Sequence, residues 1–218
     1  MSRAVLALVA LISLAGCSSQ RPIGLVQRDG DRAMLQGNPS EAIGFYQEWV
    51  DRQPRRPEAQ HALGLALLES GRPSEAAGPL TVAWDHEPDN DVYFRDMARA
   101  MREAGREASL IATLRTNATE RGRMIDYLRL GQNLQELGLM DEAHEALKTA
   151  AAIDAGRTVT PQLALAQFYH RLDRPADEVR RLRMAYAIDP SDQRVIDALM
   201  ARDVVPGPSL AITPEERP

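Results

Sequence analysis

The sequence contains few of the residues on which disulfide-stapled proteins, nucleic-acid-binding proteins and β-sheet proteins depend. Its 218 residues include one cysteine, Cys17, so no disulfide can form within the chain. Aromatic residues make up only 5% of the chain, and lysine occurs once, at Lys148. The formal net charge of −5 provides no large basic field that would attract nucleic acid. Alanine and leucine recur instead, and they favour helices because they lose little side-chain freedom there.

The apolar run at residues 4–14 is too short to cross a membrane as a helix, which takes about 20 residues. It follows Arg3 and ends in small residues, which is the pattern of a signal peptide. The adjoining Leu14-Ala15-Gly16-Cys17 resembles the lipobox of bacterial lipoproteins. The resemblance implies a signal peptide at 1–16, a lipid on Cys17, and a short tether at 17–22. An ordinary secretory signal that happens to contain a cysteine is the alternative.

The residue after the cysteine is Ser18 and not aspartate. By the lipoprotein family's rule, this implies an anchor in the outer membrane that faces the periplasm, for a cell with two membranes.

A 34-residue pattern recurs along the chain. Its clearest copy, residues 57–90, begins with apolar and small residues three and four apart, which predicts a first helix. Gly71-Arg72-Pro73 breaks this helix, and we expect Ser74 to cap a second helix with its own apolar stripe. The frame recurs in the other copies, with turns expected at Gly37-Asn38-Pro39, Gly105, Gly138 and Asp173-Arg174-Pro175. The copy at 91–123 is the least regular and is one residue short.

These copies resemble the tetratricopeptide repeat (TPR), whose signature is Leu-Gly in the first helix, Ala and a bulky residue in the second, and a closing Pro. The resemblance implies an all-α, TPR-like α-solenoid of about five helix–turn–helix repeats. We expect the second helix of each pair to pack closely against a small residue of the first. These small residues are Gly64, Ala98, Gly131 and Ala166. An irregular helical bundle is the alternative.

The expected repeat domain covers residues 23–202 and ends in a capping helix that Ser191-Asp192 begins. Glu178 stands where the family usually has Ala, which puts the packing of the last repeat in question. Residues 203–218 are proline-rich and have no apolar period, so we predict a disordered tail.

No arrangement of residues predicts a catalytic, metal or cofactor site. The four histidines are scattered and have no cysteine partner for zinc. The acidic run at residues 85–91 lacks the glycine and closing glutamate of a calcium loop. We therefore expect a protein that is not an enzyme and has no cofactor and no small-molecule substrate. An enzyme with an unrecognised site is the remote alternative.

In the TPR family the first helices line a concave groove, and residues one or two places off the core stripe point into it. This implies a partner-binding face of apolar, amide, imidazole and guanidinium side chains that suits a peptide or a partner helix. The predicted residues are His61, Leu65, Leu68, Arg95, Arg99, Arg102, Leu128, Gln132, Gln135, Leu163, Gln167 and His170. Two alternatives remain: these are ordinary surface residues, or Arg95 simply pairs with Asp91.

The signal, lipobox and repeats together resemble the repeat lipoproteins of the tight-adherence (Flp) pilus and the type IV pilotins. The resemblance implies a scaffold or adaptor in envelope assembly, in pilus or secretion-system biogenesis, whose partners are envelope proteins or peptide segments and the membrane. An adaptor for cell-wall hydrolases or proteases is the alternative.

Overall fold

The computed structural model describes residues 21–216, so the expected signal peptide and Cys17 lie outside the described residues. The chain divides into two compact units, Met1–Ala100 and Met101–Pro218, whereas the sequence predicts one repeat domain. The division falls inside a helix of the repeat that departs most from the 34-residue pattern.

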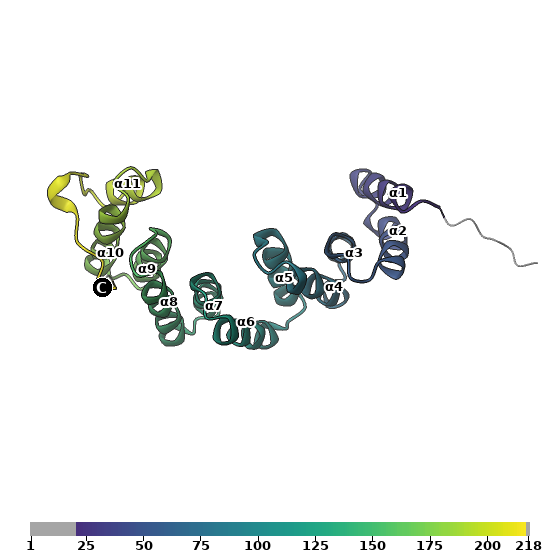
Figure 1. The fold of residues 1–218 in the computed structure, drawn as a ribbon, viewed down its shortest axis with the longest axis horizontal. Helices are drawn as coiled ribbons and strands as arrows, with labels where there is room; N and C mark the ends of the chain where they lie inside the picture. The colour runs from purple at the N-terminus through teal and green to yellow at the C-terminus, as the bar shows by residue number, and fades with distance from the viewer. Residues whose placement is uncertain (1–20, 217–218) are drawn as a thin grey trace, which may run out of the picture. The chain divides into compact units, whose positions relative to one another are not determined.

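Every regular element in the described range is helical, as predicted (Figure 1). The α-helices are α1 (Ile23–Leu35), α2 (Pro39–Arg52), α3 (Pro57–Glu69), α4 (Pro73–His86), α5 (Asp91–Glu103), α6 (Glu107–Arg121), α7 (Met124–Glu136), α8 (Met140–Asp154), α9 (Thr160–Arg171), α10 (Pro175–Ile188) and α11 (Gln193–Met200). A short 3₁₀ helix, η1 (Pro208–Leu210), follows. None of the helices in the described range has both the length and the apolar character needed to cross a bilayer.

The first unit contains the packed pairs α1–α2 and α3–α4, and α2 also packs against α3. Gly64 permits the close approach of α3 and α4, because a Cβ atom there would lie 2.4 Å from Cγ of Leu80. Gly30 plays the same part in α1, where a Cβ atom would lie 2.5 Å from the Tyr46 ring. The small residue predicted at position 64 is therefore explained by helix packing, and Gly30 is an instance that the sequence analysis missed.

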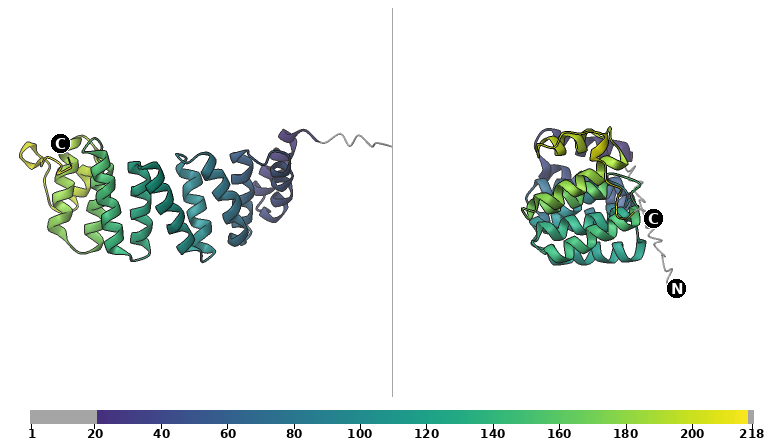
Figure 2. Two further views of the ribbon diagram at one scale, coloured as in Figure 1. Left: turned by 60° about the horizontal axis from the view of Figure 1, so that its bottom comes forward. Right: turned by 90° about the vertical axis from the view of Figure 1, so that its left-hand side faces the viewer.

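The second unit contains the pairs α7–α8 and α9–α10, with α6 against α7 and α8 against α9, so that consecutive helices lie side by side (Figure 2). Gly131 repeats the close packing, since a Cβ atom there would lie 2.7 Å from Cγ of Leu147. The last pair is covered by α11, whose Val195 and Leu199 are fully buried with Leu182. The predicted capping helix is therefore present, and Asp192 caps it by accepting a hydrogen bond from the Arg194 amide.

The turns inside the helix pairs fall where the sequence predicts them. Gly37, Gly71, Gly105 and Gly138 all have left-handed backbone angles, with φ between 67° and 76°. In the last pair Asp173 takes this conformation with φ 53°, which aspartate tolerates better than most residues. Ser74 does not cap α4 as predicted: the N-cap residue is Arg72 and the helix begins at Pro73, because proline suits the first turn.

Residues 203–216 are not the unstructured tail that the sequence predicts. Val204 and Leu210 pack on the core of α9, α10 and α11. The Ile212 amide donates to the Arg183 carbonyl at 3.3 Å, and Arg183 Nε donates to the Leu210 carbonyl at 2.8 Å. The prolines restrict this segment without any helical period, so its order comes from contacts with α10 that no local pattern encodes.

Candidate functional site

The second unit has a hollow of about 350 Å³ formed by α7, α9, α10 and α11. Four of the predicted partner-binding residues line it: Gln132, Leu163, Gln167 and His170. Leu163, Gln167 and His170 lie four and three residues apart on α9, so one helix face presents all three. The remaining lining residues are Thr160, Ala164, Ala166, Glu178, Leu182, Arg194 and Ala198.

The floor of the hollow is apolar and its rim carries amides. Leu182 is 1% exposed at the floor, whereas Gln132 and Gln167 are exposed. An amide both donates and accepts hydrogen bonds, which suits the backbone groups of an extended or helical segment. The arrangement can therefore hold a neutral polypeptide segment with an aliphatic side chain directed at the floor.

Glu178, at the position where the family usually has Ala, forms one wall of the hollow. It is 7% exposed, and Arg202 Nε donates to its Oε1 at 2.9 Å. His170 Nδ1 lies 3.4 Å from Glu178 Oε2, and Arg202 also reaches this nitrogen, at 2.5 Å. The packing question raised by Glu178 is resolved because Arg202, which follows α11, neutralises the buried carboxylate.

Three of the predicted partner-binding residues are buried and do not offer a surface: Leu68 at 3% exposure, Leu128 at 4% and Gln135 at 7%. The reason is that α3 and α7 are covered on more than one side. Helix α3 packs against α2 and α4, and α7 packs against α6, α8 and α9. Consecutive helical residues point about 100° apart, so a helix with several neighbours buries positions beyond one stripe.

In the first unit, His61 and Leu65 are half-buried on α3. His61 Nε2 lies 2.8 Å from Oδ2 of the buried Asp96, and its ring lies 4.5 Å from that of Tyr93. His61 is therefore engaged in packing α3 against α5 and is only partly available to a partner.

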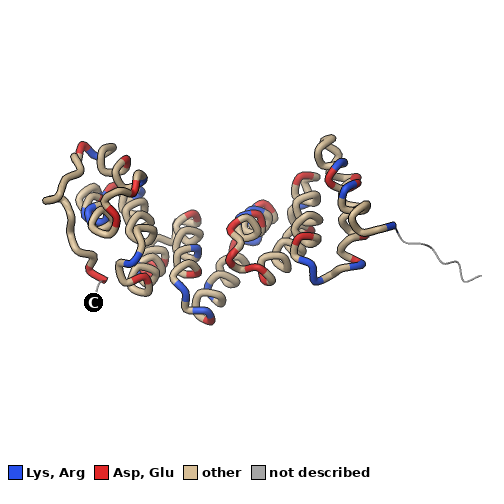
Figure 3. The backbone as a smooth tube through the Cα atoms, turned by 45° about the horizontal axis from the view of Figure 1, so that its top comes forward, with Lys and Arg blue, Asp and Glu red and all other residues tan. Residues whose placement is uncertain are grey.

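The three arginines of α5 have different surroundings. Arg99 lies 3.1 Å from Glu69 in the first unit. Arg102, in the second unit, donates to Asn133 at 2.8 Å and lies 3.1 Å from Glu136. Arg95 is exposed and lies 3.8 Å from Asp96. Two of the three thus meet carboxylates on other helices, and Figure 3 shows acidic and basic residues intermixed along both units. Arg99 and Arg102 are therefore engaged with residues of their own units and are only partly available to a partner.

No group of three or more His, Cys, Asp and Glu residues within the described range could hold a metal ion. His144 is instead part of an aromatic cluster, stacked on Phe168 with ring centroids 5.1 Å apart and bonded to the Tyr169 hydroxyl at 2.9 Å. Burial, followed by the positive charge of Lys148, lowers the pKa of His144. The imidazole is therefore neutral near pH 7 and serves the α8–α9 packing.

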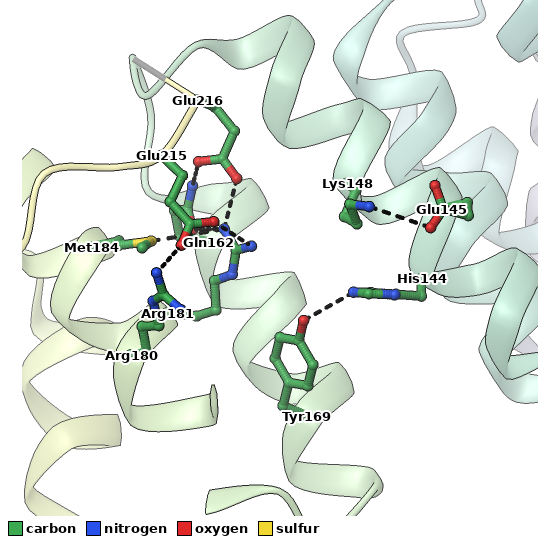
Figure 4. A network of polar contacts seen from close by, with 10 residues as sticks. All are labelled: His144, Glu145, Lys148, Gln162, Tyr169, Arg180, Arg181, Met184, Glu215 and Glu216. Carbon is green, nitrogen blue, oxygen red and sulfur yellow. Dashed lines mark hydrogen bonds and ion pairs between the residues drawn. The ribbon is translucent and has the colours of Figure 1, made fainter. Parts of the chain in front are cut away.

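A second polar cluster in this unit was not predicted. It joins Gln162 on α9 and Arg181 on α10 to Glu216 at the end of the described chain (Figure 4). Gln162 lies on the same face of α9 as the buried Leu165, Ala166 and Tyr169, and a polar residue on such a face was the available sequence signal. Gln60 holds the equivalent position in α3 and donates to the Pro54 carbonyl at 2.7 Å.

Several solved structures have a similar fold. A structure of MamA (41-end) from Desulfovibrio magneticus RS-1 matches with a TM-score of 0.51 and 17% identity, over 78% of this chain and 97% of that one. A crystal structure of a MamA protein matches with a TM-score of 0.50 and 18% identity, over 85% and 98%. A thermophilic TPR protein from Thermus thermophilus matches with a TM-score of 0.49 and 20% identity, over 82% and 100%.

The fold is TPR-like. At these identities the likeness concerns the fold alone, and it agrees with the helix pairs and the 34-residue spacing of this chain. No protein-family model matches the sequence, and no curated protein matches it. The TPR-like helix pairs therefore provide a frame for the hollow, and the residues that line the hollow determine its chemistry.

Proposed function

We propose that this protein is a membrane-anchored TPR lipoprotein that acts as a scaffold for protein–protein interactions in envelope assembly, in pilus or secretion-system biogenesis. The observation that carries the proposal is the hollow of the second unit, in which Gln132, Leu163, Gln167 and His170 lie together. Stacked helix pairs present such surfaces on a rigid frame, and an amphipathic helix or an extended peptide fits them.

The anchor part of the proposal rests on the residues around Cys17. A lipid there would hold the protein on a membrane, because each buried methylene contributes about 0.8 kcal/mol and two or three chains anchor stably. By the lipoprotein rule for Ser18, the proposed membrane is the outer one, with the protein facing the periplasm. Cys17→Ser should abolish incorporation of a labelled fatty acid in growing cells. Undiminished label in the variant would contradict lipidation at this residue.

The partner class follows from the chemistry of the hollow. Its carboxylate, Glu178, is neutralised by Arg202, and its cation Arg194 lies 2.6 Å from Asp192. The remaining groups are two amides, a hydroxyl, the imidazole of His170 and aliphatic side chains. The hollow therefore selects a segment through aliphatic contacts and hydrogen bonds more than through net charge.

The test blocks the rim of the hollow and leaves its core unchanged. Gln132→Arg with Gln167→Arg places two long cations at exposed positions, so circular dichroism should match the parent. Cross-linking in intact cells, followed by mass spectrometry, should then recover partner proteins at least tenfold less efficiently. Gln27→Arg with Gln47→Arg is the matched control, because both positions are exposed on α1 and α2 and lie outside the hollow.

The identity of the recovered proteins decides the finer assignment. Secretin or pilin components among them would support the assembly role. Recovery of only cell-wall hydrolases or proteases would replace it with an adaptor for those enzymes. Equal recovery by the rim variant and the parent would move the binding surface away from the hollow.

A further inference from the structure

Helices α9 and α10 bury a polar pair, Arg181 and Gln162, that does not line the hollow. Arg181 is 7% exposed and Gln162 is 1% exposed. Arg181 Nη1 donates to Gln162 Oε1 at 3.1 Å, and the Gln162 amide group donates to Glu216 Oε2 at 2.9 Å. Arg181 Nη1 also donates to Glu216 Oε1 at 2.6 Å, which closes a triangle around one carboxylate (Figure 4).

The geometry makes the pair a receptor for an anion. A buried guanidinium without a carboxylate is costly, because its lost hydration is not replaced. Glu216 supplies the charge, and Glu215 adds contacts to Arg180 and, at 3.4 Å, to Arg181. Burial acts to raise the pKa of Glu216, but the hydrogen bonds that its carboxylate accepts, that from Arg181 foremost, together with the charge of Arg181 lower that pKa. The carboxylate is thus bound in its charged form.

The residues before Glu215 are held as a peptide ligand would be. Val204 and Leu210 pack on the core of the second unit. Arg183 on α10 bonds to the main chain of the segment twice: its side chain donates to the Leu210 carbonyl, and its carbonyl accepts from the Ile212 amide. Pro214 is buried next to the glutamates. Apolar anchors, main-chain bonds and a charged end are the elements by which grooves recognise extended segments.

We propose that α9 and α10 form a binding site for an extended acidic peptide, and that residues 204–216 of the same chain occupy this site. The ligand class is a proline-containing segment with an aliphatic anchor followed, within a few residues, by two glutamates. A partner segment of this chemistry binds only by displacing the chain's own segment, which its short tether keeps at millimolar effective concentration. Neither Arg181 nor Gln162 lines the hollow, and this proposal does not depend on the function proposed for the hollow.

The test uses the full chain and a fluorescent synthetic peptide of residues 204–218. In the variant Glu215→Gln with Glu216→Gln, the chain's own segment loses its charged end and competes less. Fluorescence anisotropy should show that the peptide binds this variant at least tenfold more tightly than it binds the parent. The control variant Glu107→Gln with Glu120→Gln changes two glutamates of α6 and should behave like the parent.

A second arm of the test compares two peptides on the same Glu215→Gln, Glu216→Gln chain. A peptide in which both glutamates are glutamine should bind the Glu215→Gln, Glu216→Gln chain at least tenfold more weakly than the native peptide does. Equal binding of the two peptides would show that Arg181 and Gln162 do not read the carboxylates, and would overturn the proposal. So would absence of peptide binding to a variant whose circular dichroism matches the parent.

Discussion

Two helix pairs with the same register are held together in different ways. In α3–α4 of the first unit, Gly64 packs against Leu80; in α9–α10 of the second, Ala166 and Leu182 occupy the same two positions. The first pair has no room for a Cβ atom at Gly64. The second contains buried Glu178, Gln162 and Arg181, whose partners come from residues 202–216.

The difference teaches that one helix-pair architecture can be stabilised by shape or by charge. Close apolar packing is complete within α3–α4 and does not vary with pH. The buried Glu178 and Arg181 of α9–α10 take their opposite charges from Arg202 and Glu216, which follow α11. The last pair therefore depends on a segment that follows it in the chain, and substitutions can separate the two kinds of stabilisation.

The largest expected effect on stability comes from truncating the leucine that each pair has at the equivalent position, Leu80 in α4 and Leu182 in α10. Leu80→Ala should lower the free energy of unfolding by an amount in the upper half of the range of about 2–5 kcal/mol, since Leu80 is fully buried and a cavity remains. Leu182→Ala should cost an amount in the lower half, because Leu182 borders the hollow and water can reach the vacated space. Urea unfolding followed by circular dichroism measures both. Equal losses would contradict the difference drawn between the pairs.

A smaller effect is expected from a methyl group at the close contact of α3–α4. Gly64→Ala should destabilise the protein by about 1–3 kcal/mol, because the new Cβ would overlap Leu80. Gly44→Ala in α2 is the matched control: it lies inside a helix with no atom within 4 Å of an added Cβ. The control should be stabilised by about 0.5–1 kcal/mol. Thermal denaturation measures the stability of both variants. A Gly64→Ala variant as stable as the parent would argue against close packing at this contact.

The smallest effect concerns pH and the acidic end of the segment. The pKa of Glu216 is lowered in the folded protein, so the unfolded chain binds more protons, and the contribution of this residue is present above its ordinary pKa of about 4.3. That contribution is lost as the pH falls through the folded-state value. The stability difference between the parent and Glu216→Gln should therefore shrink as the pH falls from 7 to 3.

The comparison for the pH experiment is Leu80→Ala, whose stability difference from the parent should stay constant over the same pH range. Urea unfolding curves at several pH values provide the measurement. A constant difference for Glu216→Gln as well would mean that its carboxylate contributes nothing through ionisation.

The repeat periodicity was sufficient to predict the helices, their turns and the small residues at Gly64 and Gly131, because these depend on local spacing and on one partner helix. The candidate site was predicted only in part. Gln132, Leu163, Gln167 and His170 lie together in the hollow, but Leu68, Leu128 and Gln135 are buried. A stripe rule assumes one covered face, and α3 and α7 each have several neighbours.

The sequence by itself determined an all-helical chain of TPR-like pairs with a capping helix after Asp192, since spacing, glycine turns and a cap residue act within a few residues. Only the tertiary structure decided that residues 203–216 are ordered, that Glu178 meets Arg202, and that Arg181 and Gln162 hold Glu216. These contacts join residues 24 to 54 positions apart. No local pattern encodes them, because the partner of a buried charge is set by which distant residues the folded chain brings next to it.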